Sequence, residues 1–139
     1  MSDTLSDALS QAAAWQRVIH GLHVFQAALD GFRAALSRLD RPLVAPADAP
    51  ELLTEWLACQ SALDDLPDAP GEGLSASVRL ALVRREMEEY LRGDRWSVAG
   101  LRGCAAELGQ TCAAALAAAD RELRRALATA QHTVEEQVP

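Results

Sequence analysis

Two histidines early in the chain and one cysteine near its end are the residues whose chemistry could hold a metal ion. His20 and His23 are three positions apart, so on a helix their imidazoles would face one ligand. Cys112 would lie at a similar height if the first and last helical segments run antiparallel. Zinc accepts imidazole and thiolate ligands, but no second close pair of Cys or His completes a four-ligand set. A metal-binding or sensor bundle using these three residues is therefore the alternative function, and core or boundary histidines are the expectation.

The motifs of several helical enzymes and phosphate-binding proteins are missing from the sequence. A di-iron bundle needs Glu-x-x-His pairs, and the chain has none. His20 is not followed by the Lys-Gly pair typical of histidine phosphotransfer bundles. No glycine-rich phosphate loop follows a strand, since no strand is predicted. We therefore predict that the protein is not an enzyme and has no catalytic residues, no bound metal and no cofactor.

The cysteines do not form a disulfide framework, because Cys59, Cys104 and Cys112 are odd in number and irregular in spacing. Cys104 and Cys112 would lie roughly 12 Å apart on one helix, which is too far for a disulfide bond. We expect free, buried thiols in a reducing cytosol.

The amino-acid composition predicts an all-α fold. Half of the 139 residues are apolar, and Ala and Leu dominate while the β-branched residues that favour strands are sparse. The length fits a single domain over residues 1–139. All 13 basic residues are arginine, which is typical of a GC-rich genome and favours a bacterial or phage source.

Two long helical segments at the ends of the sequence would position His20, His23 and Cys112. From Leu5 to Leu39, apolar side chains recur every three or four positions, close to the coiled-coil period. A similar, alanine-rich stripe runs from Val98 to Val134. Prolines and glycines separate two shorter amphipathic stretches between them. We predict an elongated antiparallel four-helix bundle with long first and last helices and two short middle helices, at about 3–39, 49–66, 76–92 and 97–136.

The difference in length between these helices predicts a symmetric homodimer. The end helices would span roughly 50–60 Å and the middle helices about 22–28 Å, so residues 3–17 and 119–136 would form a two-helix stub. Two such stubs could pair into a second four-helix bundle. The alternative is that the helix ends fray or that the loops fold over the stub. The predicted interface consists of Leu5, Leu9, Ala12, Trp15, Leu123, Leu127 and Ala130.

The formal net charge of −7 is concentrated in the middle of the chain. Between Pro42 and Ser77 there are seven acids and no base, while the other 13 acids balance the 13 arginines. A solvated polar face explains such a segment, and an acidic docking surface for a basic protein is the sharper interpretation. Acids interleave with the arginines elsewhere, which disfavours nucleic-acid binding. The predicted acidic surface consists of Asp48, Glu51, Glu55, Asp64, Asp65, Asp68 and Glu72.

No apolar run reaches the roughly 20 residues that a membrane-spanning helix needs, and the first residues are acidic rather than basic. We therefore expect a cytoplasmic protein without a membrane partner. The sequence favours a non-enzymatic protein–protein interaction module, such as an adaptor, chaperone or assembly subunit. Its expected partners are a second copy of the chain and a protein with a basic surface.

Overall fold

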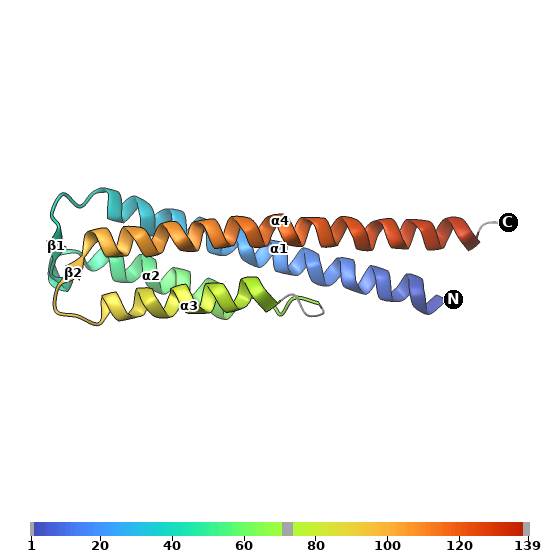
Figure 1. Cartoon of the computed structure of the whole chain (residues 1–139), viewed down its shortest axis with the longest axis horizontal. Helices are drawn as coiled ribbons and strands as arrows, with labels where there is room; N and C mark the ends of the chain where they lie inside the picture. Colours follow the sequence, from blue (N-terminus) through green and yellow to red (C-terminus); the bar gives the residue numbers. More distant parts are fainter. Residues whose placement is uncertain (1, 71–73, 138–139) are drawn as a thin grey trace.

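The all-α prediction is confirmed by the computed structural model, which describes residues 2–70 and 74–137 (Figure 1). Each α-helix begins and ends within two residues of its predicted range. The elements in chain order are α1 (Ser2–Ser37), β1 (Leu43–Val44), the 3₁₀ helix η1 (Pro46–Asp48), α2 (Pro50–Asp64), α3 (Leu74–Leu91), β2 (Trp96–Ser97) and α4 (Val98–Gln137).

The two long helices, α1 and α4, run antiparallel and side by side, and the two ends of the chain lie at the same end of the molecule (Figure 1). At the other end, α2 packs on α1 and α3 packs on α4. A Cβ atom at Gly21 would lie only 2.9 Å from Cδ1 of Leu66, so the chain after α2 reaches α1 at the level of Gly21. We call residues 3–17 of α1 together with 119–136 of α4 the hairpin half, and the remainder the bundle half.

Most of the large buried side chains lie in the bundle half; Trp15 is the exception. Phe25 and Phe32 of α1 and Trp96 of β2 are almost completely buried, and the rings of Phe32 and Trp56 pack with their centroids 5.6 Å apart. In the hairpin half the buried residues are mostly small. Since apolar stabilisation scales with the area removed from water, the bundle half supplies most of it. The buried apolar residues of the hairpin half are Ala8, Ala12, Trp15, Ala119, Ala126 and Ala130.

A short antiparallel ladder closes the bundle half, and the sequence did not predict it. Leu43 pairs with Ser97 and Val44 with Trp96. The backbone N–H of Val98 donates to the carbonyl oxygen of Pro42 at 3.0 Å. These bonds hold the connection that enters α2 beside the turn that enters α4.

Candidate interaction surfaces

The structure does not bring His20, His23 and Cys112 together. Both histidines are exposed on α1, whereas Cys112 is buried and its Sγ donates to the carbonyl oxygen of Leu22 at 3.5 Å. Burial, with a smaller effect from Asp30, raises the pKa of the Cys112 thiol to about 11, so it is protonated near neutral pH. Across residues 2–70 and 74–137, no group of three or more His, Cys, Asp or Glu could hold a metal ion.

The other two cysteines are also free and buried. Burial and the nearby carboxylate of Glu55 raise the pKa of Cys59 to about 12. Burial, followed by the effect of Glu86, raises the pKa of Cys104 to about 11. Thiols that are protonated and buried make poor nucleophiles and poor metal ligands.

The residues of the predicted acidic surface are mostly exposed. Glu55 is half-buried and lies against Gly31 of α1, where a Cβ atom would meet its Oε2 at 2.6 Å. Within the described part of the chain, Asp64 is the only member of the set that forms an ion pair. Glu72 lies outside the described residues. The exposed members are Asp48, Glu51, Asp64, Asp65 and Asp68.

The pair formed by Asp64 belongs to a polar contact between α2 and α3. Arg84 Nη1 lies 2.8 Å from Asp64 Oδ1, and Arg84 Nε donates to Glu88 Oε1 at 3.2 Å. Glu88 also accepts from Gln60 Nε2 at 3.0 Å. These hydrogen bonds raise the pKa of Arg84, most strongly through Asp64, so the guanidinium stays charged. The contact joins the two short helices and leaves Asp48, Glu51, Asp65 and Asp68 exposed to water.

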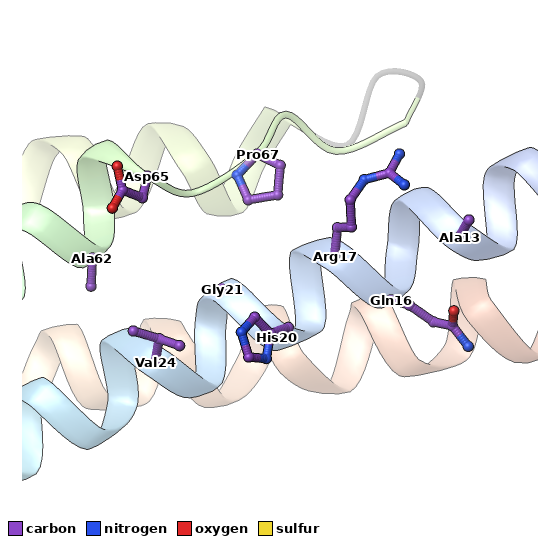
Figure 2. Close-up of a pocket in the computed structure, with 9 residues that line it drawn as sticks. All are labelled: Ala13, Gln16, Arg17, His20, Gly21, Val24, Ala62, Asp65 and Pro67. Atoms are coloured by element: carbon purple, nitrogen blue, oxygen red, sulfur yellow. The ribbon is translucent and has the colours of Figure 1, made fainter.

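An open groove of about 660 Å³ lies between α1 and the end of α2 (Figure 2). Arg17 extends from α1 towards the segment after Pro67, while Asp65 lies directly after α2 (Figure 2). Val24, a residue that is 48% exposed, contributes apolar surface. The volume lies within the range of ligand-binding clefts. The lining residues are Ala13, Gln16, Arg17, His20, Gly21, Val24, Ala62, Asp65 and Pro67.

This groove depends on a close approach that sequence periodicity could not specify. A Cβ atom at Gly21 would meet Leu66 Cδ1 at 2.9 Å and Pro67 Cδ at 3.3 Å. The absence of a side chain at Gly21 therefore lets the chain turn against α1 and form one wall of the groove. Asp65 connects the groove to the acidic surface, since it is a member of both.

The seven residues of the predicted dimer interface fall into three groups. Ala12, Trp15 and Ala130 have exposed fractions of only 4, 9 and 6%, because α1 and α4 bury them against each other. A second copy of the chain therefore cannot reach these three unless the hairpin opens. Leu5 and Leu123 are half-buried. Leu9 and Leu127 are exposed by 52% and 45%.

None of the helices in the described part of the chain is long and apolar enough to cross a membrane. Comparisons with models of protein families, with curated proteins and with solved structures found no match.

Proposed function

We propose that this protein is a non-enzymatic protein–protein interaction module, an adaptor, chaperone or assembly subunit, that presents its acidic surface to a protein with a basic surface. One observation carries the proposal. The excess negative charge of the chain lies between Pro42 and Ser77, and of its six described acids only Asp64 is neutralised by an ion pair. Asp48, Glu51, Asp65 and Asp68 are exposed to water.

A surface of this kind favours a cationic partner for two physical reasons. Uncompensated carboxylates of one sign create a potential that accelerates the encounter with a basic protein and orients it. The groove beside Asp65 adds apolar area, which can anchor a side chain of the partner while the acids contact its charges. We place the interaction in the bacterial cytoplasm, with a second copy of the chain as a further partner, and assign no role to nucleic acid or membrane.

The metal-binding or sensor alternative has less support. Its three proposed ligands lie in different environments, with two exposed imidazoles on α1 and a buried, protonated thiol at Cys112. A tetrahedral site would need these groups to converge within about 2.0–2.3 Å of one ion. Metal analysis of the purified protein, with His23→Ala as the comparison, tests this alternative directly.

Partner capture with charge-neutralised variants tests the proposed function. The surface variant combines Asp48→Asn, Glu51→Gln, Asp65→Asn and Asp68→Asn. The control variant combines Asp3→Asn, Asp30→Asn, Asp94→Asn and Glu107→Gln. All eight positions are exposed, and both variants remove the same amount of charge.

Proteins captured from the native host are identified by mass spectrometry, and each is then purified and titrated with the three forms of the chain. We expect a basic protein whose affinity falls about tenfold or more in the surface variant, stays near wild type in the control variant, and weakens as salt increases. A partner that binds both variants equally, or whose affinity does not depend on salt, contradicts the proposal.

A further inference from the structure

The hairpin half carries large apolar side chains that no other part of the described chain covers. Leu9 on α1 and Leu127 and Val134 on α4 are exposed by 52, 45 and 45%. Towards the bundle half, Ile19 and Leu116 are partly buried. We call these residues, together with the half-buried Leu5 and Leu123, the apolar strip: Leu5, Leu9, Ile19, Leu116, Leu123, Leu127 and Val134.

The exposed leucines of the two helices lie on one side of the hairpin. On the opposite side, Asp7 and Arg125 line the same polar recess, and each directly precedes a buried alanine, Ala8 or Ala126. In an antiparallel pair, residues that precede the buried stripe on both helices share one side, and residues that follow it share the other. Leu9 follows Ala8 and Leu127 follows Ala126, so both lie on the side away from the recess.

The two sides of the hairpin half therefore differ in chemistry. The recess is lined mostly by charged and polar residues, which are well solvated by water without a partner. The strip side presents isobutyl and isopropyl groups, whose exposure to water costs free energy in proportion to their area. The contact between α1 and α4 beneath both sides is made largely of alanines, which bury little area. A partner that packs on the strip side would therefore remove apolar area from water and stabilise the hairpin half.

We propose that a second copy of this chain covers the apolar strip, so that two hairpin halves pack strip to strip in a symmetric dimer. Self-association brings together two surfaces of the same apolar character, which is what an isologous interface requires. The proposal replaces Ala12, Trp15 and Ala130 in the expected interface with Ile19, Leu116 and Val134. It does not depend on the acidic surface.

The charges around the strip permit such a contact. Asp120 and Arg124, which flank Leu123, neutralise each other through a contact of 3.0 Å. The excess negative charge of each copy lies in the segment after Pro42. This segment packs along α1 from Gly31, beside Glu55, to Gly21, beside Leu66, and it borders the groove that also contains Ala13. From Gly21 to Leu9 the distance along α1 is about 18 Å, roughly twice the Debye length at physiological salt. Repulsion from acids at the level of Gly21 is therefore largely screened at Leu9 and Leu127, which lie towards the end of the strip that is farther from the acidic segment.

The area of the apolar strip indicates how tightly the two copies should associate. From Leu116 to Val134 it runs about 27 Å along α4, and two adjacent helices are roughly 20 Å wide, which gives about 540 Å² for each copy. A standard interface buries about 800 Å² for each partner. The dimer should therefore be reversible and depend on protein concentration, rather than obligate.

Light scattering over a range of concentrations up to high micromolar tests the proposal. We expect the wild-type mass to rise from one copy towards two. The variant that combines Leu9→Glu with Leu127→Glu should associate about tenfold or more weakly, because pairing would bury carboxylates against leucine. Leu82→Glu is the matched control, since Leu82 is exposed by 60% on α3 and lies outside the strip.

Far-UV circular dichroism checks that each variant keeps its helices. If the paired glutamates reduce the helical signal, the combination of Leu9→Gln with Leu127→Gln replaces it. A wild-type chain that stays monomeric at high micromolar concentration overturns the proposal. A dimer that survives both strip variants, or that Leu82→Glu disrupts equally, also overturns it. Because no other protein is present, this result is independent of partner capture through the acidic surface.

Discussion

Nη2 of Arg102 on α4 donates to the carbonyl oxygen of Leu36 in the last turn of α1 at 3.0 Å. The same nitrogen donates to the carbonyl oxygen of Leu39 at 2.9 Å. The last carbonyls of a helix have no partner within the helix, and a cation beside them also interacts favourably with the helix dipole. Arg102, which lies on α4 and is distant in sequence, therefore caps the C-terminal end of α1.

Replacing Arg102 with methionine tests this contact. We expect Arg102→Met to lower the free energy of unfolding by about 1 kcal/mol, because the carbonyls of Leu36 and Leu39 lose a charged donor. Arg121→Met is the control, since Arg121 is exposed on the same helix. Urea unfolding measures both variants, and equal effects would mean that the contact adds nothing beyond general charge.

Two glycines of α4 should respond to alanine in opposite directions. A Cβ atom at Gly103 would have no neighbour within 4 Å, so Gly103→Ala should stabilise the protein by about 0.5–1 kcal/mol through helix propensity. A Cβ atom at Gly100 would lie 2.5 Å from Cε1 of Tyr90, so Gly100→Ala displaces that ring. We expect a net loss of about 1 kcal/mol there. Thermal unfolding of both variants shows whether each substitution raises or lowers the stability. A more stable Gly100→Ala variant would contradict the packing of Tyr90 of α3 on α4.

The buried thiols predict a loss of stability at alkaline pH. Each folded pKa is raised from an ordinary value of 9.0, to about 12 for Cys59 and to about 11 for Cys104 and Cys112. Above pH 9 the unfolded chain releases thiol protons that the folded chain keeps, so the free energy of unfolding falls as the pH rises. The contribution of the protonated thiols to the free energy of unfolding is fully present below pH 9 and is lost as the pH approaches 11 to 12.

Replacing Cys112 with serine removes one of the three titrating thiols, so its contribution to the pH dependence of stability can be measured. Serine keeps a donor for the carbonyl oxygen of Leu22 but does not titrate in this range. The slope of stability against pH should become shallower by up to about 1.4 kcal/mol per pH unit. Urea unfolding at several pH values between 9 and 11 measures the slope for both proteins. Identical slopes would show that Cys112 ionises as readily in the folded chain as in the unfolded one.

The contact of Arg84 with Asp64 and Glu88 should stabilise the fold more than an exposed ion pair does. The side chain of Arg84 is 27% exposed, whereas that of Arg124, which pairs with Asp120, is 79% exposed. We expect Arg84→Met to cost about 1 kcal/mol and Arg124→Met less than about 0.5 kcal/mol. Urea unfolding at low and high salt compares them. Equal costs would mean that partial burial adds nothing to the contact between α2 and α3.

The helices could be predicted from the sequence because their signals are local. Apolar side chains at every third or fourth position, prolines at the first two connections and Gly93 at the third indicated each boundary to within two residues. The ladder could not be predicted, because Leu43–Val44 and Trp96–Ser97 are too short to show a strand pattern. Its pairing depends on the distant ends of α1 and α3 meeting in space.

The candidate surfaces were less predictable for a related reason. The sequence showed that Ala12, Trp15 and Ala130 belong to apolar faces, but not that α1 and α4 would bury these residues against each other. The groove depends on a contact between Gly21 and Leu66, which are separated by a connection and a helix. The exposure of five of the acidic residues could be predicted, since charged side chains rarely become buried without partners. The half-burial of Glu55 against Gly31 could not.

The pairing of α1 with α4 has a consequence for biosynthesis. The ribosome makes α1 before α4, yet these two helices form the most extensive contact between elements of the described chain. Until α4 emerges, Leu22, Phe25 and Leu29 on α1 lack the helix that covers them. The completed fold therefore forms only after translation of α4, and the nascent chain exposes an aggregation-prone stripe until then.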